Sequence, residues 1–320
     1  MQDEAATGIV RFVHGPIVST SDIDAHLALF AAFGLREVAR CERSVEETAA
    51  IWGVDRQSSI EVTLETPGTT FGIRLVRFDP GSTAQIRDPS RGTDSEALKV
   101  IDFYAPDLAA ARASIEAAGF AFKPDVADYV TPEGRYQEAH LWGPDGVVCA
   151  LISGDAALFD DLATIRDRLV SEPQSISGPV QDAAATLAFF KDVLKLDVVH
   201  RYGLDDPSFD ALMGAPARVK LRAWNVGLNK REPYFGVIDY GLPLGSQVSI
   251  KASARPPARG LLGATLIVRD AATVAAEAGV GVVTLDVPGF GPARVATVQG
   301  PNGAWFQAIQ PTNGGPEGTS

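Results

Sequence analysis

The chain has 320 residues, of which 46% are hydrophobic and 21% charged, a globular composition with room for two domains of about 150 residues each. Its formal net charge of −12 argues against nucleic acid and anionic membranes as partners, because their phosphates would be repelled. No apolar run reaches the roughly 18 residues that a membrane-spanning helix needs, and the acidic start "MQDEAATGIVRF" lacks a secretory apolar core. The two cysteines, Cys41 and Cys149, form no metal-binding or disulfide pattern, so a reducing cytoplasm is the expected location.

The first predicted unit occupies residues 9–82. Its opening stretch, "HGPIVSTSDIDAHLALFAAFGLREVAR" (residues 14–40), predicts a strand, a helix that begins near Asp22 and a second strand. The stretch "WGVDRQSSIEVTLETPGTTFGIRLVRFDPG" (residues 52–81) predicts two further strands around a turn. The unit therefore has the order β-α-β-β-β.

A second unit of the same kind occupies residues 97–154. In "LKVIDFYAPDLAAARASIEAAGFAF" a strand, a helix that begins near Asp107 and another strand follow one another again. A hairpin then follows in "HLWGPDGVVCALISG", whose Gly-Pro-Asp-Gly turn begins at Gly143 and combines residues that tight turns favour. Residues 155–174 predict a helical linker that ends near Pro173.

Residues 175–311 repeat this pattern in two more units. The stretch "SGPVQDAAATLAFFKDVLKLDVVHR" matches the first unit, with its Gly-Pro pair 178 − 15 = 163 residues later. In "TVQGPNGAWFQAIQ" the hairpin turn returns at Gly300, 300 − 143 = 157 residues after the first. Each of the four helices is predicted to begin with a capping aspartate: Asp22, Asp107, Asp182 and Asp270. The last residues, 312–320, are predicted to be disordered.

Four β-α-β-β-β units, an aspartate before each helix and a Pro-Asp-Gly-like turn in alternate units resemble the vicinal oxygen chelate superfamily. That superfamily includes glyoxalase I, bleomycin-resistance proteins and type I extradiol dioxygenases. The resemblance covers residues 9–311 and implies an α+β fold with two glyoxalase-like domains, residues 9–154 and residues 175–311. In each domain two units would curl their sheet around a cup. Because this scaffold carries many chemistries, the resemblance specifies the fold more closely than the function.

The same resemblance implies positions for the ligands of a divalent metal ion. Carried onto this chain, the family's eight ligand positions fall on or beside His14, Arg74, Lys99, Ala150, Ser177, Asp239, Leu262 and Gln307. A lysine and an arginine among these positions would repel a cation, so no cofactor is expected. The alternative is an atypical site for Fe, Mn, Ni or Zn that is built around His14 and His140.

The strand "EGRYQEAHLWG" carries the strongest candidates for chemistry. Alternation along a strand predicts that Tyr136, Glu138, His140 and Trp142 share one face. Glu138 is close enough along the strand to raise the imidazole pKa of His140, which makes this histidine a candidate general base. Asp102 has the opposite parity from Lys99 and is expected to point away from the cup.

Together with other residues of the first two units, these residues predict a charged cup in the amino-terminal half. Predicted catalytic residues are His140, His14 and Glu138, and predicted substrate-binding residues are Arg74, Lys99, Tyr136, Trp142 and Phe71. Arginine and lysine would stabilise negative charge that develops on a carbonyl oxygen. The carboxy-terminal cup is expected to be structural, with the neutral or weakly acidic residues Ser177, Tyr202, Asn225, Asp239, Thr297 and Gln307.

The leading functional hypothesis is a lyase or isomerase of the glyoxalase superfamily that acts by acid/base chemistry. Its substrate would be a small carbonyl-bearing or phenolic, anionic metabolite bound in the amino-terminal cup. Two alternatives stay open: a non-catalytic binding or resistance protein, and a metal-dependent extradiol-type dioxygenase or lyase with atypical ligands. A small molecule is the expected partner, and the chain could act as a monomer or a homodimer.

Overall fold

A computed structural model places residues 8–155, 162–243 and 245–312 of the chain. Four modules of the predicted β-α-β-β-β order follow one another, and modules 1 and 3 each carry one extra short helix. Module 1 comprises β1 (Val10–Ser19), α1 (Ile23–Ala32), β2 (Arg36–Arg43), α2 (Val45–Trp52), β3 (Ser58–Glu65) and β4 (Gly72–Asp79). Module 2 comprises β5 (Val100–Tyr104), α3 (Leu108–Ala117), β6 (Phe122–Thr131), β7 (Gly134–Trp142) and β8 (Val148–Gly154). Module 3 comprises β9 (Pro173–Pro179), α5 (Ala183–Asp192), β10 (Asp197–Leu204), α6 (Pro207–Met213), β11 (Leu221–Gly227) and β12 (Tyr234–Asp239). Module 4 comprises β13 (Gly260–Val268), α7 (Ala271–Ala278), β14 (Val283–Val287), β15 (Gly291–Gln299) and β16 (Trp305–Pro311).

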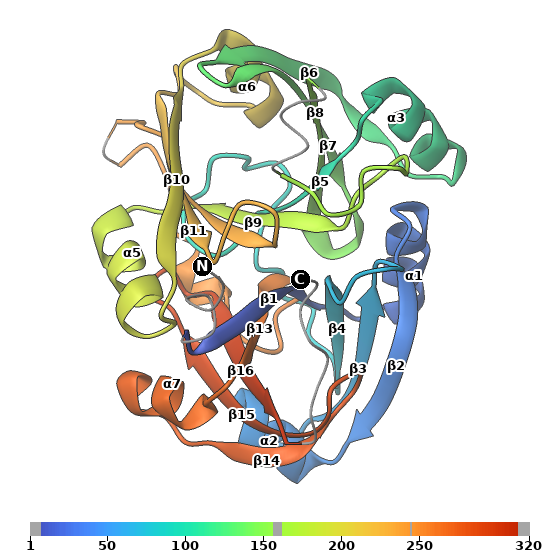
Figure 1. Ribbon diagram of the computed structural model, residues 1–320, viewed down its shortest axis with the longest axis vertical. Coiled ribbons are helices and arrows are strands. Elements are labelled where there is room, and N and C mark those ends of the chain that lie inside the picture. Colours follow the sequence, from blue (N-terminus) through green and yellow to red (C-terminus); the bar gives the residue numbers. More distant parts are fainter. Residues whose placement is uncertain (1–7, 156–161, 244, 313–320) are drawn as a thin grey trace, which may run out of the picture.

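The modules join into two curled sheets of eight strands each (Figure 1). Sheet 1, with the order β14-β15-β16-β13-β1-β4-β3-β2, combines modules 1 and 4. Sheet 2, with the order β10-β11-β12-β9-β5-β8-β7-β6, combines modules 2 and 3. The predicted α+β fold of four paired modules is confirmed. The expectation that modules 1 and 2 share one cup is wrong, because each of them pairs with a module from the other half of the chain.

Two long connections explain this pairing. Residues 80–99 lead from sheet 1 to sheet 2, and residues 240–259 lead back. At the centre of each sheet the first strands of two modules run antiparallel, β1 beside β13 and β5 beside β9. Because all four modules show the same pattern in the sequence, the repeat identifies the units without showing which of them share a sheet.

The Gly-Pro pair of module 3 has a steric role at the centre of sheet 2. A Cβ atom on Gly178 would lie 2.4 Å from the carbonyl oxygen of Ala97. Only glycine allows these two backbone segments to approach so closely. The repeated Gly-Pro motif therefore marks a place where backbones meet, in addition to marking the start of a unit.

The four predicted helix caps are confirmed. In each case the aspartate carboxylate accepts a hydrogen bond from a backbone N–H in the first turn of its helix: Asp22, Asp107, Asp182 and Asp270. These bonds satisfy N–H groups that have no partner within the helix.

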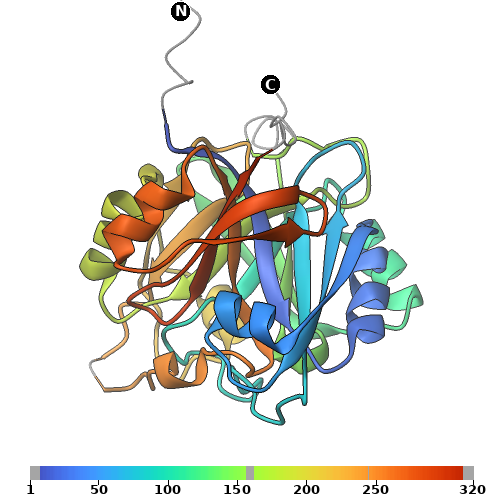
Figure 2. The same cartoon turned by 90° about the horizontal axis from the view of Figure 1, so that it is seen from below.

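The main apolar core lies between the convex faces of the two sheets. Figures 1 and 2 show α1 beside α3 at one edge of this layer and α5 beside α7 at the opposite edge. Phe33, which follows α1, packs against Phe103 of sheet 2 with ring centroids 4.7 Å apart. Phe190 of α5 contacts both Phe235 of sheet 2 and Phe306 of sheet 1. The helices thus hold the two sheets together and leave both concave faces, cup 1 of sheet 1 and cup 2 of sheet 2, facing away from this core.

The segment between β8 and β9 was expected to be a helical linker. Its described part, residues 162–172, contains no helix, and residues 156–161 lie outside the described ranges. The expected disordered tail falls on residues 313–320, which also lie outside them, apart from Thr312. Among the residues that the structure places, no helix combines the length and the apolar character needed to cross a bilayer.

Candidate functional site

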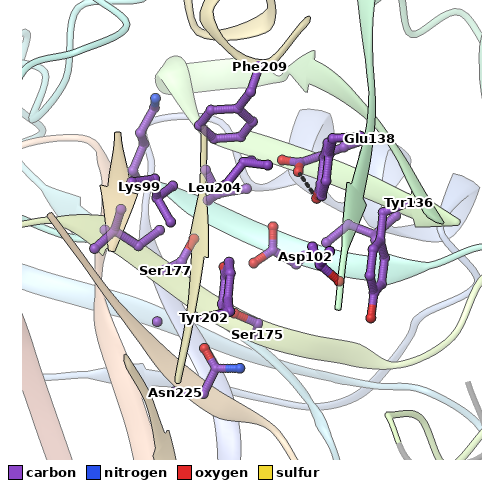
Figure 3. Close-up of a pocket in the computed structure, with 18 of the residues that line it drawn as sticks. Lys99, Asp102, Tyr136, Glu138, Ser175, Ser177, Tyr202, Leu204, Phe209 and Asn225 are labelled. Carbon is purple, nitrogen blue, oxygen red and sulfur yellow. Dashed lines mark hydrogen bonds between the residues drawn. The ribbon is translucent and has the colours of Figure 1, made fainter. Parts of the chain in front are cut away.

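Cup 2 contains a cavity that both of its modules line. The volume of the cavity is about 120 Å³, and its walls come from the strands β5 to β12 and from α6. Figure 3 shows Asp102 in the middle of this cavity, with Lys99 and Ser177 on one side and Glu138 and Tyr136 on the other. The cavity therefore joins residues predicted for the amino-terminal cup with Ser177, which was predicted for the other cup.

Asp102 is a buried carboxylate at the centre of sheet 2. It lies on β5 opposite Ser175 of β9, and only 7% of its surface is exposed. Burial, followed by the neighbouring Glu138, raises the pKa of Asp102 to about 7, although hydrogen bonds from Ser175 and Ser177 act in the opposite direction. A carboxyl group that is partly protonated near neutral pH can both accept and donate a proton.

The expectation that Asp102 points away from the cup is wrong. Lys99 precedes β5, which begins at Val100, so the alternation of a strand does not extend back to it. Lys99 and Asp102 both line the cavity despite their opposite parity.

Glu138 and His140 form a pair on β7. The His140 Nε2 atom lies 2.7 Å from Glu138 Oε1, and the Tyr129 hydroxyl donates to Glu138 Oε2 at 3.1 Å. Burial lowers the pKa of His140 and outweighs the opposing effect of the Glu138 carboxylate. The predicted rise in this pKa is therefore wrong in direction, because desolvation of the imidazolium outweighs its attraction to Glu138.

The common face predicted for β7 is only partly seen in the cavity. Tyr136, Glu138 and His140 line it, whereas Trp142 packs outside it against Val100, Val148 and Ala150. The Lys123 ammonium lies 5.2 Å from the centre of the Trp142 ring.

Lys99 lies at one end of the cavity, close to α6. Its Nζ donates to the Gly92 carbonyl oxygen at 2.5 Å and to the Tyr240 hydroxyl at 3.2 Å, and it lies 3.4 Å from Met213 Sδ. Burial and then the nearby Arg87 hold the pKa of Lys99 well below its usual value. Desolvation without an ion-pair partner disfavours the ammonium form.

Tyrosine is the side chain that characterises cup 2. The chain contains 6 tyrosines, and all of them line this cavity: Tyr104, Tyr129, Tyr136, Tyr202, Tyr234 and Tyr240. The rings of Tyr129 and Tyr136 stack with centroids 5.8 Å apart. Burial raises the pKa of Tyr104, Tyr129 and Tyr202, so their phenols stay protonated and can donate hydrogen bonds.

Tyr136 and Tyr202 were named from the sequence, but the other four tyrosines were not, and these lie on or beside β5, β6 and β12: Tyr104, Tyr129, Tyr234 and Tyr240. A usable signal was nevertheless present in the sequence. All the tyrosines fall between residues 104 and 240, within modules 2 and 3. Asp102 was not predicted to line the site, because the predicted strand included Lys99, whereas β5 begins at Val100.

The other predicted site residues lie in cup 1, in the opposite sheet. His14 is fully buried, with its Nδ1 atom 2.7 Å from the Thr70 carbonyl oxygen, and burial lowers its pKa to about 4. Phe71 packs edge-on against Phe12 in the apolar filling of the same cup. The prediction that His14, Phe71 and Arg74 join His140 in one cup is wrong, because modules 1 and 2 belong to different sheets.

Arg74 is enclosed by polar partners in cup 1. Its guanidinium donates to Glu61 Oε2 at 2.9 Å and to Gln307 Oε1, while the Arg43 Nε atom lies 3.0 Å from the same Glu61 oxygen. The Trp52 indole N–H, at the end of α2, donates to the other Glu61 oxygen at 3.3 Å. These contacts form the cup 1 ion network, which consists of Arg43, Glu61 and Arg74.

Neither cup offers the donor set that the resemblance implies for a divalent metal. In cup 1 the Arg74 guanidinium directly contacts Gln307, which occupies another expected ligand position. In cup 2 the expected positions hold Lys99, Ala150 and Ser177, while Asp239 pairs with Arg222 and lies outside the cavity lining. The described ranges contain no group of three or more His, Cys, Asp or Glu side chains arranged to bind an ion. The residues present therefore do not fit the family's metal site.

Comparisons with known proteins bear on the fold. No protein-family model matches the chain. No curated protein sequence matches it either. Glyoxalase I from Zea mays superposes on it with a TM-score of 0.61 and 14% identity, over 97% of this chain and 95% of that one. A dioxygenase-like protein from Bacillus subtilis superposes with a TM-score of 0.56 and 9% identity, over 96% of this chain and 87% of that one.

These similarities extend over nearly the whole chain and agree with the four-module repeat, the two curled sheets and the capped helices described above. The chain has the fold of the vicinal oxygen chelate superfamily.

Proposed function

We propose that cup 2 is an active site in which Asp102 transfers a proton to and from a small organic molecule that bears a carbonyl or phenol group. The observation that supports this most directly is the meeting of Asp102 and the hydrogen-bonded pair Glu138–His140 in one cavity lined by tyrosines. Two separate proton-carrying groups, both buried and lining one cavity, are typical of acid/base catalysis.

The proposed chemistry begins at a carbon atom next to a carbonyl group. Asp102 removes the proton from this carbon, and the electron pair of the C–H bond moves toward the carbonyl oxygen to give an enolate. Phenol donors at the cavity wall, such as Tyr202, would stabilise the negative oxygen by hydrogen bonding. Return of a proton to the same carbon restores the carbonyl compound, with the original hydrogen exchanged for one from the solvent, and the atoms balance without an added reactant.

The Glu138–His140 pair has a supporting role in this proposal. Its Glu138 carboxylate is one of the causes of the raised pKa of Asp102, through the unfavourable proximity of two negative charges. Glu138 is held in place by the Tyr129 hydroxyl and by the His140 ring. Burial, the larger cause, and the Glu138 carboxylate together raise the pKa of Asp102 to about 7, so that Asp102 can exchange protons near neutral pH.

An exchange experiment tests the proposal without knowledge of the natural substrate. The protein is incubated in D2O with 4-hydroxyphenylacetone, and deuterium incorporation beside the carbonyl is followed by NMR. Asp102→Asn should slow the exchange about 10²–10⁴-fold, the usual range for a general base. Asp125→Asn, a change at an exposed position of β6, serves as the matched control and should exchange at the rate of the unmodified protein.

Exchange no faster than in buffer, or equally fast in Asp102→Asn, would overturn the proposal. Binding of the ketone without exchange would also overturn it and would instead identify a binding site that performs no turnover.

A further inference from the structure

We infer that the ligand of cup 2 carries a positive charge next to an aromatic or other planar group, as in an aralkyl ammonium ion. The inference names the ligand class for the cavity of the proposed function and rests on that function only for its location. Three features of cup 2 support it: its tyrosine lining, its balance of carboxylates over cations, and the internal engagement of its lysine.

The tyrosine lining favours a cation. All six tyrosines of the chain face this one cavity, and the faces of aromatic rings attract positive charge through their quadrupole. Tyr202 lies beside Asp102 in the close-up view, so a ring and a carboxylate border the same space (Figure 3). An ammonium group placed there would contact both.

The charges of the cavity also favour a cation. Asp102 and Glu138 lie within it, and Glu133 is at its wall with His200, whose Nε2 atom is 3.6 Å from the Glu133 carboxylate. Lys99 is the lysine in the lining. Burial lowers the pKa of both His140 and His200, which favours their neutral forms. The carboxylates therefore outnumber the cations that face the ligand.

The amino group of Lys99 does not compensate the excess of carboxylates that a bound molecule would meet. The Lys99 Nζ atom is already in contact with the Gly92 carbonyl oxygen, the Tyr240 hydroxyl and Met213 Sδ. In the close-up view the Lys99 side chain points away from Asp102 (Figure 3). The anionic substrate predicted from the sequence depended on both Arg74 and Lys99, and Arg74 lies in the other cup.

Three matched probes test the charge of the ligand by calorimetry. Tyramine is cationic, 4-propylphenol is its neutral analogue, and 4-hydroxyphenylacetate is an anion of similar size. We expect tyramine to bind about tenfold more tightly than 4-propylphenol, as a desolvated cation–π contact would give, and the anion to bind most weakly. Asp102→Asn should reduce this preference, whereas Asp125→Asn should preserve it.

A second pair of variants separates the ring from the carboxylate. Tyr202→Phe keeps an aromatic face and should retain the preference for tyramine, whereas Tyr202→Leu removes the face and should weaken tyramine more than 4-propylphenol. Tyr202 is partly exposed, so both variants are expected to fold.

Proton release gives an independent measure of the contact with Asp102. The charged and polar groups that act on this carboxyl are Glu138 of β7, Ser175 and Ser177 of β9 and, most weakly, Lys99 before β5. Because its pKa is about 7, tyramine binding at pH 7 should release up to about half a proton, measured by calorimetry in two buffers of different ionisation enthalpy.

Tightest binding of 4-hydroxyphenylacetate, equal binding of all three probes, or no binding of tyramine would overturn the inference. None of these results would affect the deuterium-exchange test with the uncharged ketone. Absence of exchange would in turn leave the order of affinities intact, so the two proposals can fail separately.

Discussion

Cups 1 and 2 are built from the same repeated unit, yet their interiors differ. In cup 1 the short helix α2 brings Ile51 and Trp52 into an apolar cluster, and the buried Glu61 and Arg74 pair beside it. In cup 2 the corresponding helix α6 contributes Phe209 and Met213 to the wall of a cavity that remains open. Arg43, Glu61 and Arg74 of cup 1 therefore pair with one another, whereas the ionisable groups of cup 2 line a space that a ligand can enter. The same repeated unit can therefore form a structural core in one sheet and line a cavity in the other.

The largest expected effect concerns the cup 1 ion network. Glu61→Gln removes the carboxylate between two buried guanidinium groups and leaves their charges uncompensated. We expect the free energy of unfolding to fall by about 3–5 kcal/mol, measured by urea denaturation. Glu37→Gln, which breaks a partly exposed pair with Arg40, is the matched control and should change it by less than about 1 kcal/mol. Similar effects of the two variants would show that cup 1 does not depend on its internal charges.

The Asp102 carboxyl of cup 2 should make the protein less stable as the pH rises. The pKa of Asp102 is about 7 in the folded protein, above its ordinary value of 3.8, so its contribution is fully present below about pH 4 and is lost on going up through pH 7. Relative to Asp102→Asn, the wild-type protein should lose up to about 4 kcal/mol over this interval. The measurement is urea denaturation at intervals from pH 4 to pH 8. A constant difference between the two proteins would contradict the burial of this carboxyl.

Cup 1 should respond to pH in the opposite direction. The pKa of His14 is about 4 in the folded protein, below its ordinary value of 6.5, so its contribution is present above pH 6.5 and is lost as the pH falls toward 4. The loss should be up to about 3 kcal/mol relative to His14→Asn, whose amide nitrogen can take the place of Nδ1 against the Thr70 carbonyl. Thermal denaturation between pH 4 and pH 7.5 measures it. Parallel curves for the two proteins would refute a buried neutral imidazole.

The smallest expected effect concerns the support of Glu138 in cup 2. Tyr129→Phe keeps the ring and removes the hydroxyl that donates to Glu138. We expect a loss of about 1–2 kcal/mol in unfolding free energy, since a hydrogen bond to a charged group is removed. Tyr136→Phe is the control, because it keeps the ring stack with Tyr129 and leaves the bond to Glu138 unchanged. Equal losses in both variants would show that this bond contributes nothing specific.

The sequence allowed the modules and the helix caps to be predicted, because turn residues, aspartate caps and apolar periodicity act locally. The shared face of Glu138 and His140 also followed from strand alternation. The pairing of modules did not follow, since it depends on contacts between strands about 250 residues apart, such as Val10 and Val268. The inward position of Asp102 did not follow from the sequence, because alternation counted from Lys99 places Asp102 on the opposite face. The strand β5 begins one residue later, at Val100, and a shift of one residue moves every side chain of a strand to the other face.

The order of the modules has a consequence for how the protein folds during synthesis. Sheet 2 consists of one continuous stretch of chain, residues 100–239, whereas sheet 1 needs both ends. All strands of sheet 2 are available once residue 239 has left the ribosome, while β1 must wait for β13, which begins at Gly260. Contacts that close such long loops form slowly. The half of the molecule that bears the cavity can therefore assemble first, and the half that encloses its own charges completes the fold last.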